Sequence, residues 1–376
     1  MDWQNIFFPV SLDFISGKND VGNKVTRNEG ASLTLEGKSI AFFSVEEGAP
    51  TAANTFRKSW YGMRNAAHVE NFVDLGDFIV GKEYGEKEVN ELGYALSELM
   101  EHGLTTVAVS SVPQLFSRAV EKAHDFLKKP YTAVEVNNRI ADSNSFGAID
   151  SPDWLTRALQ QDTPYLRQYG LLGYQTFYVG EDQLDYLDKL GFECHRLGAI
   201  KGSLIGAEPM IRSANYLKCS CEAIQAHVIG NAHQYPNGLS GEEACALLRF
   251  AGASPGMKLV SMETSDGSLN PVSAELFAQM LWYFCEGTLM RYEEDPLNDE
   301  ANFTKYVTHL DRPADNIIFY KSTRTDKWWM YLPVEEKKHP ESEYLIPCSY
   351  ADYQQAASGE VPNKWLSAVN RLSLRD

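Results

Sequence analysis

The sequence has no run of about 18 consecutive apolar residues, so no segment is predicted to span a membrane as a helix. Cations are scarce: 34 Lys and Arg stand against 51 Asp and Glu, and the net charge at pH 7 is −17. A surface of that sign repels nucleic acid and anionic lipid, which argues against both as main partners. The N-terminal residues lack a basic segment and a long apolar stretch, so we do not expect a signal peptide. We expect an acidic cytoplasmic protein.

Residues that carry metal or redox chemistry are also few. The chain has six cysteines, and the closest two, Cys219 and Cys221, are too close together for the usual zinc clip. We interpret all six as reduced core thiols. Of the eight histidines only His227 and His233 are near each other, in a segment that we expect to be a solvated loop. The sequence has no P-loop, no G-x-G-x-x-G and no H-E-x-x-H.

Between about residues 39 and 292, short apolar segments alternate with segments of helical periodicity. This alternation predicts an α/β fold in which a mostly parallel sheet is covered by helices on both faces. The expected strands are 39–45, 71–75, 105–109, 133–136, 173–180, 193–197, 216–221 and 258–262. The expected helices are 53–63, 86–101, 113–128, 182–190, 241–251 and 272–292.

The pattern changes after Pro296. The segment up to about residue 334 alternates and is rich in aromatic residues, which predicts two or three antiparallel strands, and helices are expected near 350–357 and 364–372. We therefore divide the chain into a domain of residues 1–296 and an extension of residues 297–376. The extension is expected to pack on the first domain, because it is too short to build a core of its own. Packing is the favoured role of the adjacent Trp328 and Trp329, with an exposed binding role as the alternative.

The segment "PYTAVEVNNRIADSN", residues 130–144, raises a question about function. Tyr131–Val136 is predicted to be a buried strand, and the carboxyl end of such a strand is where α/β proteins usually bind ligands. The residues that follow, Asn137 to Ala141, are two amides, an arginine, an isoleucine and an alanine. They offer no carboxylate at this position.

Two segments resemble the arginase–agmatinase–formimidoylglutamase (ureohydrolase) superfamily. They are "HVIGNAHQYPNGLSGEEACALLRFAGAS", beginning at His227, and "AELFAQMLWYFCEGTLMRY", beginning at Ala274. The segments "IIFYKSTRTDKWWMYLP" and "LIPCSYADYQQAASGEVPNKW" resemble the C-terminal extension of a divergent branch found in Bacteroidetes-type bacteria. The resemblance implies a three-layer α/β/α fold. In active members it also implies a pair of Mn²⁺ ions at the strand ends, which activate a water for attack on a guanidinium or formimino carbon.

The resemblance places the metal ligands of active members on residues that cannot replace them. The histidine of the first motif falls on Pro113. The two aspartates and the histidine of the second motif fall on Asn137, Ala141 and Arg139. Two Mn²⁺ ions need several anionic ligands to offset their charge and their lost hydration, and an arginine opposes that.

The third motif leaves a single acid. Its two aspartates fall on Ser220 and Glu222, so only Glu222 offers a carboxylate. Glu263 matches a glutamate that holds the cationic group of the substrate in active members. Because a buried arginine needs acids, we expect Arg139 to pair with Glu222 or Glu263, the acids that the resemblance places at the same end of the sheet.

The resemblance and these substitutions together predict a metal-free, catalytically degenerate arginase-like protein. We expect it to act as a scaffold, regulatory or binding protein whose partner is another protein or a small molecule, and a homo-oligomer is left open. Two alternatives stay open. One is a divergent C–N hydrolase of the formimidoylglutamase type acting on linear amidines, and the other is a binder of a small amidine or amino acid.

Overall fold

The computed structural model of the chain describes residues 3–11, 17–30, 33–140, 153–161, 165–230, 235–264, 269–309, 316–332 and 344–373. Ala141 lies outside the described residues. In the part that is described, no helix is long and apolar enough to cross a membrane. All six cysteines are free, as expected, and five of them are buried.

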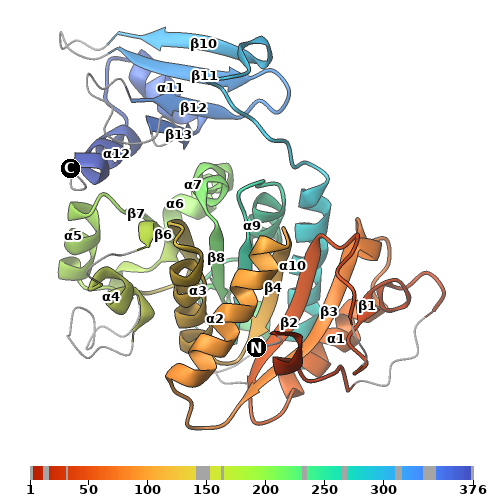
Figure 1. Cartoon of the computed structure of the whole chain (residues 1–376). Coiled ribbons are helices and arrows are strands. Elements are labelled where there is room, and N and C mark those ends of the chain that lie inside the picture. Colours follow the sequence, from red (N-terminus) through yellow and green to blue (C-terminus); the bar gives the residue numbers. More distant parts are fainter. Residues whose placement is uncertain are drawn as a thin grey trace.

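The described part of the main domain contains a nine-stranded sheet in which all neighbours are parallel (Figure 1). The strand order is β1-β3-β2-β4-β9-β8-β5-β6-β7. The α/β architecture predicted from the sequence is confirmed. The strands are β1 (Thr26–Arg27), β2 (Ile40–Glu47), β3 (Phe72–Val80), β4 (Thr105–Ser110), β5 (Tyr131–Val136), β6 (Leu166–Tyr174), β7 (Glu193–Arg196), β8 (Tyr216–Ser220) and β9 (Leu259–Glu263).

Helices cover both faces of this sheet because successive side chains of each strand point to opposite sides. In β4, Val107 and Val109 face the core under α1, α9 and α10, and Ala108 faces the core under α2 and α3. Figure 1 shows these two helical layers. The helices are α1 (Thr51–Gly62), α2 (Glu86–Glu101), α3 (Pro113–Leu127), α4 (Trp154–Leu159), α5 (Glu181–Lys189), α6 (Leu197–Gly202), α7 (Glu208–Ser213), α8 (Ala226–Ile229), α9 (Gly241–Gly252) and α10 (Pro271–Thr288).

One predicted strand is wrong. The segment 173–180 was expected to be a strand, but β6 ends at Tyr174 and a short 3-10 helix, η4 (Thr176–Tyr178), follows. Gly173 has a positive φ of 92°, and Phe177 is 68% exposed. Phe177 and Tyr178 therefore lie outside the sheet, where Tyr178 packs against Tyr235.

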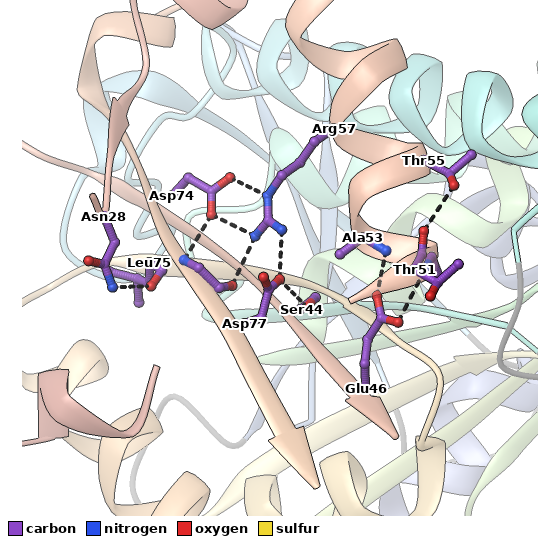
Figure 2. Close-up of polar contacts among 12 residues, drawn as sticks. Asn28, Ser44, Glu46, Thr51, Ala53, Thr55, Arg57, Asp74, Leu75 and Asp77 are labelled. Atoms are coloured by element: carbon purple, nitrogen blue, oxygen red, sulfur yellow. Dashed lines mark hydrogen bonds and ion pairs between the residues drawn. The ribbon is translucent and has the colours of Figure 1, made fainter. Parts of the chain in front are cut away.

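A buried ion-pair network fixes α1 on the sheet (Figure 2). The guanidinium of Arg57 in α1 lies 2.8 Å from Asp74 Oδ2 and 2.6 Å from Asp77 Oδ1, both in β3. Glu46, at the end of β2, accepts hydrogen bonds from the backbone N–H groups of Ala52 and Ala53 in the first turn of α1. A carboxylate at this end of a helix is favourable because the first N–H groups have no partner inside the helix.

The C-terminal extension contains a second, antiparallel sheet with the strand order β10-β11-β12-β13. The expectation of two or three strands missed β13, which follows a segment outside the described residues. The extension also has a small core of its own, which includes Phe319, Met330 and Ile346, so the expectation that it could not form one was wrong. Its elements are β10 (Phe303–Thr308), β11 (Ile317–Ser322), β12 (Trp328–Tyr331), β13 (Leu345–Cys348), α11 (Tyr350–Ala357) and α12 (Asn363–Ser373).

Arg212 in α7 joins the extension to the main domain. Its Nη2 donates to the backbone carbonyls of Trp328 at 2.9 Å and Cys348 at 3.3 Å, which lie on β12 and β13. Its guanidinium carbon also lies 4.3 Å from the centre of the Trp329 ring. Both tryptophans are buried, so the packing role expected for them is confirmed. The division of the chain at residues 296 and 297 stays a prediction.

Candidate functional site at the carboxyl ends of the central strands

Three of the residues singled out from the sequence lie on neighbouring strand ends. Ser220 at the end of β8 is in register with Glu263 at the end of β9, and Asn137 follows the last residue of β5, the next strand. Pro113 is the first residue of α3, which begins just after β4. The fold therefore brings Asn137, Ser220 and Glu263 to one edge of the sheet.

Arg139 and Glu222 form an ion pair at this edge. Arg139 Nη2 lies 2.8 Å from Glu222 Oε2 and 2.9 Å from Oε1, which confirms the expected pairing. The guanidinium carbon also lies 5.6 Å from the centre of the Tyr235 ring. The Arg139 side chain is 41% exposed, so solvent screens the pair and its contribution to stability is expected to be at most about 1 kcal/mol.

A second ion-pair group lies directly below this edge, and its central residue is Lys218. The Lys218 ammonium is buried in the middle of β8, 3.1 Å from Glu135 Oε1 in β5 and 3.6 Å from Glu263 Oε2 in β9. Glu263 thus pairs with Lys218, whereas Arg139 pairs with Glu222. The Trp154 ring centre lies 5.6 Å from the ammonium.

Further hydrogen bonds hold both carboxylates of this group. Glu135 accepts from the Tyr169 hydroxyl at 2.8 Å and from the Asn137 side-chain amide at 2.9 Å. Glu263 accepts from the Ser261 hydroxyl at 3.1 Å. Because buried carboxylates without partners are costly, this set of donors explains how two acids are tolerated around one cation.

Lys218 is shared by two carboxyl groups, and this arrangement affects the pKa values of both Lys218 and Glu263. Burial would lower the pKa of Lys218, but Glu135 and Glu263 outweigh it and raise that pKa, so the ammonium stays charged. Burial and the negative charge of Glu135 raise the pKa of Glu263 to about 7, against the opposing effect of Lys218. Near neutral pH the Glu263 carboxyl group is therefore partly protonated.

Sequence reasoning missed Lys218 and Glu135, although a signal was present. Both are single charged residues inside segments that otherwise predict buried strands, "YLKCS" and "YTAVEV". A lone lysine in one buried strand and a lone glutamate in another are expected to pair, because neither charge is stable alone in a core. The pairing itself requires β5 and β8 to be neighbours, which the structure shows.

The side chains that the structure describes at this edge do not fit a pair of Mn²⁺ ions. Asn137 and Ser220 are neutral, Glu222 is bound by Arg139, and Glu263 is bound by Lys218. Both fixed cations would repel a divalent ion, and both available carboxylates would have to leave an existing partner. Within the described residues, no three His, Cys, Asp or Glu side chains are grouped so that they could hold a metal ion.

A G-x-S-x-G spacing does occur at Gly252–Gly256, but its surroundings differ from a nucleophile elbow. An elbow needs the serine exposed on a sharp turn between a strand and a helix. Here the spacing begins at the last residue of α9 and precedes β9. Ser254 is buried and its hydroxyl donates to the Arg212 carbonyl at 3.1 Å, so it has a structural role.

Comparison with solved structures finds a similar fold in three hydrolases. The chain is similar to formiminoglutamase from Trypanosoma cruzi with Mn²⁺ (TM-score 0.59, 14% identity, 73% of this chain and 99% of that one). It is similar to formimidoylglutamase from Bacillus subtilis (TM-score 0.62, 12% identity, 75% and 96%) and to agmatine ureohydrolase of Thermoplasma volcanium (TM-score 0.54, 14% identity, 69% and 92%).

These similarities confirm, at the level of the fold, the resemblance found in the sequence. No protein-family model matches the chain, and no curated protein sequence matches it. At 12–14% identity the likeness concerns the arrangement of the elements, and the chemistry has to be argued from the residues at the strand ends.

Proposed function

We propose that this chain is a divergent member of the ureohydrolase superfamily that holds no catalytic metal pair and acts as a scaffold, regulatory or binding protein in the cytoplasm. The observation that carries the proposal is the buried Lys218 ammonium, 3.1 Å from Glu135 and 3.6 Å from Glu263. A fixed protein cation lies directly beneath the strand ends where the superfamily places its metals. The Arg139 guanidinium adds a second positive charge beside Glu222.

The second candidate is a hydrolase of linear amidines, which is favoured by one finding. The similar structures named above are a formiminoglutamase, a formimidoylglutamase and an agmatine ureohydrolase. Against this candidate, Glu263 is 2% exposed and already bound to Lys218 and Ser261. A cationic substrate would have to displace the ammonium before it could reach that carboxylate.

Metal loading separates the two candidates. The purified chain is incubated with Mn²⁺, dialysed and subjected to elemental analysis, with Trypanosoma cruzi formiminoglutamase treated in parallel as the positive control. We expect no stoichiometric Mn in this chain, no rise in its melting temperature with added Mn²⁺, and no hydrolysis of formiminoglutamate or agmatine. Two Mn ions per chain together with metal-dependent hydrolysis would overturn the proposal.

A further inference from the structure

A cavity of about 210 Å³ lies at the same edge of the sheet as Arg139 and Glu222, where β6 and β7 end. Tyr174 and Arg196, the last residues of these two strands, line it together with η4 and the start of α6. The two strands are parallel neighbours, so their carboxyl ends lie side by side. The volume is below the usual range of about 300–1,000 Å³ for small-molecule sites, so a ligand of this cavity has to be small.

The charge of the cavity differs from that of the whole molecule, which is −17. Among the described residues that line it, two are cations, Arg196 and Lys201, and none is an acid. Lys201 already pairs with Glu243 at 2.9 Å. Arg196 is exposed, and no carboxylate in the described part of the chain lies within 4 Å of its guanidinium. The cavity therefore offers a ligand one positive charge that has no partner.

The wall that η4 forms is held in place by its neighbours. The side-chain amide of Gln175, just before η4, donates to the Asn237 carbonyl at 3.0 Å. Tyr178, the last residue of η4, packs against Tyr235 with the ring centres 4.7 Å apart. The Phe177 ring lies edge-on to Tyr178 at 4.5 Å and lines the cavity, although it is 68% exposed. A large ring held at the surface gives a ligand an apolar face to cover.

A carboxylate matches this arrangement in charge and in shape. A guanidinium binds a carboxylate through two parallel N–H···O bonds, and the single charge of the carboxylate equals that of Arg196. A phosphate monoester carries close to two negative charges at pH 7, more than one unpaired cation balances. An organic cation would be repelled by Arg196 and would find no acid among the described lining residues. Phe177 and Leu197 favour a ligand with an apolar body.

We propose that this cavity binds a small organic carboxylate, whose carboxylate group is held by Arg196 and whose apolar part covers the Phe177 ring. The inference deepens the proposed binding role by giving it a site and a class of ligand. It uses none of the residues on which the argument about the metal pair depends. Mn²⁺ loading and carboxylate binding are therefore measured separately, and failure of one is distinguishable from failure of the other.

Three probes of nearly one shape test the proposal: benzoate, which is an anion, benzamide, which is neutral, and benzamidine, which is a cation at pH 7. Binding is measured by calorimetry and by the shift in melting temperature, since a ligand of the folded state raises that temperature. We expect benzoate to bind and the other two to bind at least about tenfold more weakly. Binding of benzamide or benzamidine as tight as that of benzoate would overturn the proposal.

Variants then locate the site. Arg196→Gln removes an exposed charge without breaking an ion pair, so it is expected to fold normally and to weaken benzoate binding by roughly tenfold or more. Phe177→Ala keeps the charge but removes the ring, and should weaken binding by roughly threefold or more. Arg167→Gln, at an exposed position near the amino end of β6, is the matched control and should bind like the parent chain. Unchanged binding in either of the first two variants, or no benzoate binding up to about 10 mM, also overturns the proposal.

Discussion

At the level of single residues, Lys218 and Arg139 show how burial decides how much an ion pair contributes to stability. Both are cations at the same end of the sheet with a carboxylate within about 3 Å. The Lys218 side chain is 5% exposed and the Arg139 side chain 41%. Removal of a buried partner leaves uncompensated charge in a medium that cannot solvate it, whereas removal of an exposed partner leaves a carboxylate that water can solvate.

Lys218→Met should therefore destabilise the protein strongly. The substitution leaves Glu135 and Glu263 buried without their shared cation, and losses of about 3–5 kcal/mol are typical of such a change. Urea unfolding at pH 7 measures the free energy of unfolding. Lys189→Met, at an exposed position of α5, is the control and should change it by less than about 0.5 kcal/mol. A loss at Lys218 no larger than that of the control would show that the buried ion pairs do not stabilise the fold.

Glu263→Gln should change how stability depends on pH. The pKa of Glu263 is raised from its usual 4.5 to about 7, so between these values the folded chain holds a proton that the unfolded chain has released. The contribution of Glu263 to the free energy of unfolding is therefore fully present below about pH 4.5 and is lost as the pH rises to about 7. The variant should lack this loss, which is on the order of 2 kcal/mol between pH 5 and pH 8.

Unfolding curves at several pH values provide the test. Burial also raises the pKa values of Glu46 and Glu121 to about 7. These two groups make the free energy of unfolding fall with rising pH in both the parent chain and the variant, so the test compares the two slopes. Parallel slopes for the parent chain and the variant would contradict the prediction.

At the level of secondary-structure elements, one arginine connects the two sheets. Arg212 binds two backbone carbonyls on β12 and β13 and pairs with Glu208 at 3.0 Å within α7. Every residue has a backbone carbonyl, so these contacts do not depend on which residue types stand on β12 and β13. They depend on the donor, because the guanidinium is planar and has several N–H groups, a shape that lysine lacks.

Arg212→Lys should keep the charge but loosen the extension. The ammonium can still pair with Glu208, but it cannot reach both carbonyls and stack on Trp329 at once. We expect a loss of about 1–3 kcal/mol and faster release of a fragment that begins near residue 297 in limited proteolysis. The control is Arg324→Lys, at an exposed position of the extension. Equal rates of digestion in both variants would show that Arg212 does not hold the extension, and cleavage elsewhere would contradict the division at residue 296.

For the molecule as a whole, a few of the scarce cations are buried together with acids inside an acidic protein. Among the described residues, the buried cations are Arg57, Lys218, Arg212 and Arg371. Arg57, Lys218 and Arg212 lie within 4 Å of carboxylates that come from another strand or another turn of the same helix, and Arg371 donates to the Gly191 carbonyl at 3.4 Å. More acids than cations are buried among these residues, so burial does not make the surface more acidic than the composition suggests. The net charge of −17 itself favours solubility and opposes contact with other polyanions.

The sequence by itself determined the order and type of most elements, because the hydrophobic period differs between helices and strands. The predicted helices 86–101 and 350–357 agree with α2 and α11 to the residue. The resemblance predicted that Arg139 pairs with Glu222 or Glu263 at one edge of the sheet, and the structure shows that the partner is Glu222.

Only the tertiary structure decided which strands are neighbours, and with them the partners of Lys218. Periodicity marks a segment as a strand, but it does not say that β8 lies between β5 and β9, which come from distant parts of the chain. That order brings Glu135 and Glu263 to the same ammonium. Likewise, one cavity is lined both by the amino ends of β5, β6 and β7 and by β13 and α12, which are far apart in the sequence. Long-range packing creates these contacts; local sequence patterns mark Lys218 and Glu135 as charges in buried strands, but they do not show which strands are neighbours.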